Sequence, residues 1–184
     1  FKPLSLVIVL MMFCYFTRDT MVWVFAESIA NHRVGIKPEN IGLLFSIHGA
    51  TSLLGPLLLI WFMRRYGKDK LLLLGILISG AISIVVSQTH SMLLFSLMVI
   101  MWSTAHFFTY SCIMGFAAAA DSKGTVAAVA GAAVMGGTAV APAIAGYVMD
   151  SGGPNLFTLG IIIAVLATLT FSGLSVYFTK RSNA

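Results

Sequence analysis

Two charged residues stand side by side inside the first long apolar run of the chain. Arg18 and Asp19 lie about a turn past the middle of residues 4–26. An arginine there can bind an anionic or carboxylate-bearing solute, and an aspartate can carry a coupling proton or bind a cation. The two side chains leave a helix about 100° apart, so we expect partners on different helices. The alternative role is an interhelical ion-pair network that closes one face of a cavity.

A second polar group recurs every fourth residue within residues 92–118. Trp102, His106 and Tyr110 therefore share one face of a helix, and Trp102 comes to about the depth of the charged pair. Imidazole gains and loses a proton near neutral pH, so His106 is a candidate proton acceptor or hydrogen-bond donor. Packing is the alternative role of this stripe.

Three further side chains belong with these groups as candidate substrate-binding or coupling residues. Tyr15 lies one turn before Asp19 and Trp23 one turn after it, on the same helix face. His48, within residues 41–63, lies outward of the midplane. For His48 we favour an interhelical hydrogen bond.

The runs that carry these residues indicate the class of protein. Of 184 residues, 59% are hydrophobic and 9% charged, whereas a soluble domain is about a quarter charged. Each run is long enough to cross about 30 Å of hydrocarbon as a helix. We predict an all-α membrane protein with one domain over residues 1–184 and six transmembrane helices. The runs are approximately residues 4–26, 41–63, 71–87, 92–118, 125–148 and 156–178.

The distribution of charge excludes nucleic acid as a partner and predicts an orientation. The 11 Lys and Arg residues fall in gaps between the runs rather than along one helix face. Arg33 and Lys37 lie on one side of the membrane. By the positive-inside rule the other side is cytoplasmic, together with both termini, which suits a bacterial inner membrane. Its basic residues are Lys2, Arg64, Arg65, Lys68, Lys70, Lys123, Lys180 and Arg181.

Differences in polarity predict which helices line a cavity. Residues 71–87 and 156–178 carry only scattered Gly, Ser and Thr, with Tyr177 at an interface, so we expect both to face lipid. Residues 4–26 and 92–118 carry the polar groups and should line the cavity, because a charge near mid-bilayer needs a partner or water. Cys14 and Cys112 show neither metal-ligand nor disulfide spacing, and we expect no metal and no cofactor.

The run 125–148 is built almost wholly of small residues. Steps of four residues join Ala128, Ala132 and Gly136, and join Gly137 and Ala141. Such steps let helix backbones approach closely. Pro142 removes one backbone hydrogen bond and is expected to bend the helix. The segment is either a tightly packed helix or an element that flexes during gating.

Two ordered motifs resemble the major facilitator superfamily of secondary transporters. Residues 35–42 and a run with Gly55 and Pro56, followed by Arg-Arg-Tyr-Gly-Lys-Asp-Lys at 64–70, look like the second helix of a superfamily half and its basic loop. That loop has the family pattern Gly-x-x-x-Asp-Arg-x-Gly-Arg-Arg. It is matched by Arg65, Gly67 and Lys68, and not by Ile60, Arg64 and Asp69. The eleventh helix of the family resembles the series Gly137, Ala141, Pro142, Gly146, Asp150 and Gly152.

The resemblance implies a carboxyl-terminal half of a twelve-helix transporter. Such a half consists of two inverted three-helix repeats, and the substrate site lies near the midplane against an amino-terminal six-helix half. The function it implies is secondary active transport of a small solute by alternating access, with proton coupling as our expectation. Arg65, Gly67, Lys68 and Pro142 would then have gating or conformational roles.

Other membrane proteins with six helices fit less well. An intramembrane protease needs a nucleophile motif such as Gly-x-Ser-x-Gly, which the sequence lacks, so we do not expect an enzyme. The surviving alternative is a non-transporting scaffold or a half-size bundle that associates with itself. Uptake or efflux, the substrate and the coupling ion stay open.

Overall fold

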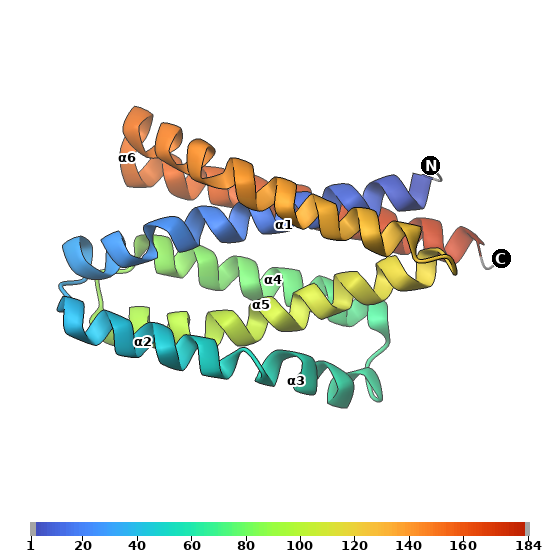
Figure 1. Ribbon diagram of the computed structural model, residues 1–184, viewed down its shortest axis with the longest axis horizontal. Helices are drawn as coiled ribbons and strands as arrows, with labels where there is room; N and C mark the ends of the chain where they lie inside the picture. The colour runs from blue at the N-terminus through green and yellow to red at the C-terminus, as the bar shows by residue number, and fades with distance from the viewer. Residues whose placement is uncertain (1–2, 183–184) are drawn as a thin grey trace.

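The computed structural model describes residues 3–182 and is built of helices throughout that range (Figure 1). Lys2, counted above among the basic residues, lies outside it. Five segments of the described chain are long and apolar enough to cross a membrane. The elements are α1 (Pro3–Ser28), a π-helical turn η1 (Ile29–Arg33), α2 (Pro38–Thr51), α3 (Leu54–Met63), α4 (Lys68–Gln88), α5 (Met92–Ala120) and α6 (Thr125–Ser182).

Prolines explain the interruptions inside two of these segments. Between α2 and α3 the helix is broken, because Pro56 has no N–H to donate to the carbonyl of Ser52. Within α6, Gly153 has φ 63° and ψ −158°. It precedes Pro154, whose ring excludes the helical conformation at the residue before it, and glycine adopts positive φ without penalty. The helix continues through Pro142.

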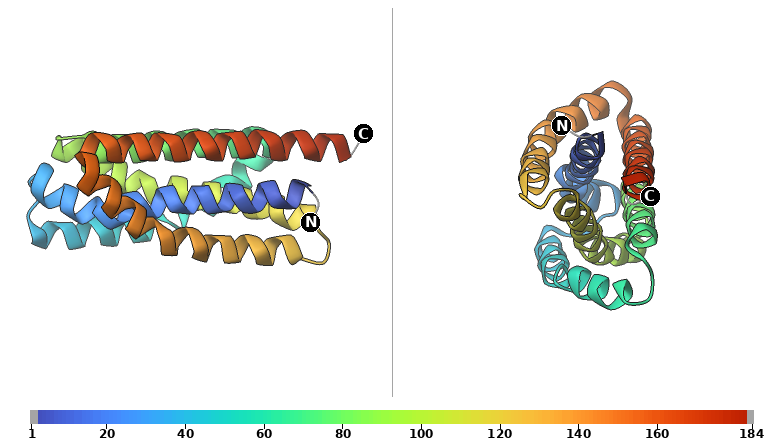
Figure 2. Two further views of the ribbon diagram at one scale, coloured as in Figure 1. Left: turned by 90° about the horizontal axis from the view of Figure 1, so that it is seen from above. Right: turned by 90° about the vertical axis from the view of Figure 1, so that its right-hand side faces the viewer.

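The helices run roughly parallel to one long axis and form a bundle (Figures 1 and 2). At Gly153 the chain of α6 reverses, so its two arms, residues 125–152 and 154–182, run in opposite directions. The N and C termini consequently lie at the same end of the bundle (Figure 1). The two arms of α6 contain the last two predicted runs, and the other four runs fall within α1, α2 with α3, α4 and α5.

Two apolar clusters form the core, one toward each end of the bundle. Tyr15 belongs to one cluster and Met21 to the other. Arg18, between them on α1, is fully buried. The polar residues of α1 therefore form a layer between two apolar regions.

One of the two expected small-residue steps makes a close helix contact. A methyl group at Gly137 would lie 2.7 Å from the carbonyl oxygen of Phe13, so the backbones of α6 and α1 nearly touch there. Ala141 is fully buried in the same contact face. The other step is not a packing face in the described structure, because Ala128 and Ala132 are exposed. The helical period turns Val126 and Ala130 inward instead.

The prediction that residues 71–87 face lipid fits one side of α4, where Leu74, Leu77 and Ile78 are exposed, but the opposite side is buried. Of the five candidate membrane segments, α4 has the largest buried share. Its Ser79, Ser83 and Ser87 are fully buried, and a methyl group at Gly80 would lie 2.9 Å from Val165 of α6. Small side chains on the buried side allow α4 to pack closely against α5 and α6. The second arm of α6 also has an exposed apolar face, with Leu159, Ile163 and Leu166.

Candidate functional site

Asp19 is the centre of a polar cluster that joins α1 to α5. Its Oδ1 accepts hydrogen bonds from Nε1 of Trp102 at 2.8 Å and from Nη2 of Arg18 at 3.1 Å. Its Oδ2 lies 2.8 Å from Nδ1 of His106. The spacing of α5 thus places Trp102 at the depth of the carboxylate, as the sequence predicted, and it brings His106 beside the carboxylate as well. The Asp19 side chain keeps 13% of its surface exposed.

The side chain of Arg18 points into the interior of the bundle, away from the exposed side of Asp19. Its Nη1 donates to Oγ of Ser79 on α4 at 3.3 Å, and the guanidinium carbon lies 4.6 Å from the centre of the Tyr15 ring. Nε has no hydrogen-bond partner among the described residues. As expected, Arg18 and Asp19 have partners on different helices, Ser79 on α4 and Trp102 on α5, and they contact each other through a single N–H. The flexible arginine side chain reaches its neighbour through one N–H, which avoids the cost of a buried cation without a counter-ion.

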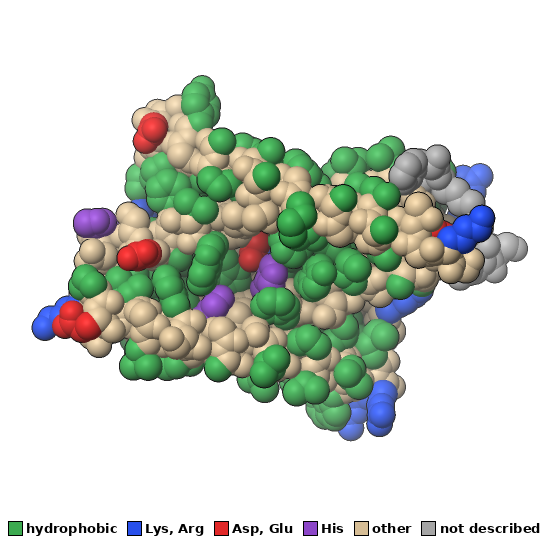
Figure 3. Space-filling view, viewed as in Figure 1, with side chains coloured by type: hydrophobic (Ala, Val, Ile, Leu, Met, Phe, Trp, Pro, Cys, Tyr) green, Lys and Arg blue, Asp and Glu red, His purple; other side chains and the backbone are tan. Residues whose placement is uncertain are grey.

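The open side of Asp19 faces a groove of about 250 Å³. In Figure 3, red acidic and purple histidine side chains meet near the middle of one face, and hydrophobic side chains surround them. Eight of the groove residues come from α1 and α5, which confirms that these two helices line a cavity. The lining residues are Phe16, Asp19, Thr20 and Trp23 of α1, His48 of α2, Trp102, Ser103, His106 and Phe107 of α5, and Thr138 of α6.

His48 lines the groove and ties α2 to α5. Its Nδ1 lies 2.7 Å from the carbonyl oxygen of Val99, which confirms the expected interhelical hydrogen bond. Its ring stacks on Trp23 with 5.1 Å between centroids. Ser103 adds a second link, because its hydroxyl donates to the carbonyl of His48. The α2 wall is thereby fixed against α5.

The two tyrosines support the site from outside the groove lining. Tyr15 is fully buried, donates to the backbone carbonyl of His106 at 3.1 Å, and stacks on its imidazole. Tyr110 is half-buried and nearly parallel to His106, with ring centroids 6.5 Å apart. Of the eight candidate site residues, Asp19, Trp23, His48, Trp102 and His106 line the groove. Arg18, Tyr15 and Tyr110 do not.

Several groove residues were missed by sequence reasoning. Thr138 lies in the small-residue arm of α6, where nothing distinguishes it from its neighbours until α6 is placed beside α1. Phe16 and Phe107 look like ordinary apolar residues of a membrane helix. Ser79, the partner of Arg18, was read as part of a lipid-facing helix. Serine in such helices often bonds its own backbone, and Ser79 also donates to the Ile76 carbonyl at 3.3 Å.

The residues expected to have gating roles lie elsewhere. Gly67 precedes the first residue of α4, and Nζ of Lys68 lies 5.1 Å from the ring centre of Phe116. The guanidinium carbon of Arg65 lies 5.5 Å from the Trp61 ring. Pro142 is exposed on α6. None of the four lines the groove.

No group of three or more His, Cys, Asp or Glu within residues 3–182 is placed to hold a metal ion. The polar contacts of the site are hydrogen bonds, the ion pair of Arg18 with Asp19, and the imidazole of His106 beside the Asp19 carboxylate.

Comparison with known proteins gives one family match. The family model described as Major Facilitator Superfamily matches residues 8–183. No curated protein and no solved structure matches the chain.

Proposed function

The chain belongs to the Major Facilitator Superfamily of membrane transporters, and on this premise we propose that it carries one wall of the substrate site of a proton-coupled secondary transporter. The observation that carries the proposal is the 2.8 Å approach of His106 Nδ1 to Asp19 Oδ2 at the wall of an open groove. An imidazole beside a carboxylate provides a group that can take up and release a proton.

The charges of the cluster favour a small anionic solute as the substrate. Arg18 and Asp19 together carry no net charge, so the cluster is neutral with neutral His106 and has one positive charge when His106 is protonated. A net charge inside the bilayer is costly. A proton on His106 and a singly charged anion in the groove keep the loaded site neutral. Arg18 has the role of the counter-ion of Asp19 in this proposal, and not of a direct substrate ligand.

The opposite wall of the cavity is proposed to come from an amino-terminal six-helix half. The groove is open to the surface, and the side chains of His106 and Asp19 in its lining keep 12% and 13% of their surface exposed. In secondary transporters with inverted repeats, two such halves rock around a site near the midplane. The two arms of α6 would then be separate spans, which gives the six spans and two three-helix repeats of one half.

Both termini are proposed to be cytoplasmic, in a bacterial inner membrane. The loop at 64–70 carries four basic residues, and it shares an end of the bundle with the termini (Figure 1). A cysteine placed at Lys68 in an otherwise cysteine-free protein tests the orientation. It should react with an impermeant maleimide only after the membrane is opened, and reaction in intact cells would reverse the topology.

Transport by the complete protein in proteoliposomes tests the function. Radiolabelled small carboxylates and matched small amines are supplied with and without an imposed pH gradient. The expected result is that the gradient drives accumulation of a carboxylate above its equilibrium level. Uptake of amines alone, or uptake that ignores the pH gradient, would contradict the proposal.

A further inference from the structure

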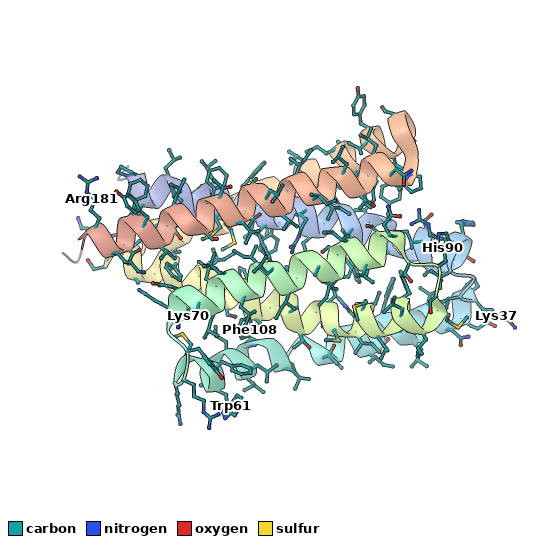
Figure 4. All side chains as sticks on the ribbon, turned by 180° about the vertical axis from the view of Figure 1, so that it is seen from behind. Lys37, Trp61, Lys70, His90, Phe108 and Arg181 are labelled. Atoms are coloured by element: carbon teal, nitrogen blue, oxygen red, sulfur yellow. The ribbon has the colours of Figure 1, made fainter. Side chains whose placement is uncertain are left out.

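A second and larger groove lies between α3 and α4. Its volume is about 640 Å³, and α5 forms its floor. Figure 4 shows the face turned away from the Asp19 groove, with Lys70 at the start of α4 and Phe108 beside it. Both residues line this second groove. No residue lines both grooves.

Glycines explain why α3 and α4 both approach α5 so closely. A methyl group at Gly55 of α3 would lie 2.5 Å from the carbonyl oxygen of Thr104 on α5. One at Gly75 of α4 would lie 2.7 Å from the hydroxyl of Thr109. Each helix is thus seated on α5, and the space between α3 and α4 stays open above it. Exposed side chains such as Leu58 and Ile78 form its rim.

The groove wall offers almost no polar group to a ligand over most of its length. The hydroxyl of Thr51 donates to the carbonyl of Ile100 at 2.9 Å, and that of Thr104 donates to the carbonyl of Thr51 at 2.9 Å. Both hydroxyls are thus engaged with the protein. This part of the groove therefore offers its occupant an apolar surface.

One end of the groove is different, because it is basic and aromatic. Lys70 and Tyr66 line that end. The adjoining segment at 64–70 carries four basic residues and one acidic residue, Asp69. A tyrosine and cationic side chains at the end of an apolar surface are typical of the level of lipid headgroups.

The length of the groove fits one leaflet of a bilayer. Its α4 side is a stripe of Lys70, Leu74, Ile78 and Ile82, spaced four residues apart. Twelve residues at about 1.5 Å each span about 18 Å. One leaflet contributes about 15 Å, half of the hydrocarbon thickness.

We propose that the groove between α3 and α4 binds one acyl chain of an anionic phospholipid, whose headgroup pairs with Lys70. Charge complementarity at the basic end selects the headgroup, and the apolar length below it holds the chain. The site does not depend on the substrate groove. A test of this lipid site can therefore fail without contradicting the proposed transport function, and the reverse is also true.

The test measures which lipid stays bound to the complete purified protein. Native mass spectrometry compares retention of 1-palmitoyl-2-oleoyl phosphatidylglycerol with that of the phosphatidylcholine of the same chains. We expect phosphatidylglycerol to be retained at least fivefold better. Equal retention of the two lipids would overturn the proposal.

Matched variants locate the bound lipid. Lys70→Gln should lower the preference for phosphatidylglycerol by about fivefold, since one basic residue near anionic lipid contributes about 1 kcal/mol. Lys68→Gln, a change two residues away at a side chain that lies over Phe116, should leave it unchanged. Equal effects of the two changes would show a diffuse surface charge and no site.

A second pair of variants tests the apolar part of the groove. Ile78→Trp fills the groove, whereas Leu77→Trp changes a neighbouring exposed residue outside its lining. Only Ile78→Trp should reduce retention of both lipids. If Ile78→Trp gives no folded protein, Leu74→Trp, at an exposed lining residue, replaces it. A lipid-independent dimer that Ile78→Trp dissociates would show that a second copy covers the groove, and would also overturn the proposal.

Discussion

The two grooves share α5 as a wall and differ in how their polar groups are satisfied. Met101, Thr104 and Phe108 face the groove between α3 and α4, whereas Trp102 and His106 face the Asp19 groove. The apolar groove is the larger, at about 640 Å³ against about 250 Å³. Size alone therefore does not distinguish the proposed substrate site from the proposed lipid site.

The hydrogen bonds make the distinction. In the apolar groove, hydroxyls donate to backbone carbonyls. In the Asp19 groove, side chains of α1 and α5 bind each other, and a carboxylate, an indole and an imidazole meet. The hydrogen bond from Trp102 to Asp19 holds α1 and α5 in register, whereas Nδ1 of His106 lies beside the carboxylate without a hydrogen bond of its own among the described residues. The predictions below test this contrast.

The largest expected effect comes from removing the carboxylate of the polar cluster. Asp19→Asn leaves the fully buried Arg18 without a counter-ion, which costs about 3–5 kcal/mol in buried pairs. We expect a large loss of folded yield and a lower melting temperature in detergent. Asp150→Asn removes an exposed acid from α6 and is the control.

The double variant tests whether charge balance between Arg18 and Asp19 is what stabilises this region. Arg18→Gln with Asp19→Asn removes both charges, so folded yield should recover most of the loss. A double variant that folds no better than Asp19→Asn would show that the pair is not what stabilises this region.

The next effect concerns the wall of the apolar groove. Gly55→Ala places a methyl group 2.5 Å from the carbonyl oxygen of Thr104 and forces α3 away from α5. Such overpacking costs about 1–3 kcal/mol. Gly49→Ala, at a helical glycine with no atom near the added methyl group, should be neutral or slightly stabilising. Thermal unfolding of both variants in the same detergent measures the difference.

The elements were predictable from the sequence, because the length and apolarity of a membrane helix are local properties. The register of Trp102 with Asp19 was predictable as well, since it follows from the spacing on α5 and the depth of each residue. The burial of α4 was not, because Ser79 and Gly80 fit a lipid-facing helix and a packed helix equally well. Which of these applies depends on Arg18 and Val165, which come from other helices.

The direction of Arg18 was beyond sequence reasoning for a similar reason. Adjacent residues on a helix point to different sides, and the sequence does not say which side is open. Only the packing of α4 and α6 on α1 places Arg18 inside and Asp19 on the groove. The same packing brings Thr138 into the site.

A smaller effect, on function and not on folding, is expected at His106. His106→Gln keeps a polar side chain beside Asp19 but cannot carry a proton near neutral pH. Accumulation driven by a pH gradient should fall at least tenfold, while exchange of substrate without a gradient should persist. His90→Gln, at an exposed residue outside both grooves, is the matched control. Accumulation that stays fully driven by the gradient would leave Asp19 as the proton carrier in this chain.

The smallest effect is expected at Asp121, a solvated carboxylate that provides a baseline for the buried Asp19. It lies between α5 and α6, where Oδ1 accepts from the backbone N–H of Lys123 and Oδ2 from that of Thr125, both at 2.9 Å. These hydrogen bonds, of which the one from Lys123 has the largest effect, hold the pKa of Asp121 below its ordinary value of 3.8. A folded-state pKa below the unfolded value stabilises the fold above the unfolded pKa, and this contribution is lost as the pH falls through the folded pKa.

Asp121→Asn should therefore lower the melting temperature slightly at pH 7, and the difference from the unmodified protein should shrink as the pH falls below 3.8. Melting curves of both proteins at pH 7 and pH 3 measure the change. Ser122→Ala, at an exposed residue of the same loop, should give no pH-dependent difference. A loss at pH 7 as large as that of Asp19→Asn would contradict the contrast drawn here, because it would mean that a carboxylate in water stabilises this bundle as much as one buried against an arginine.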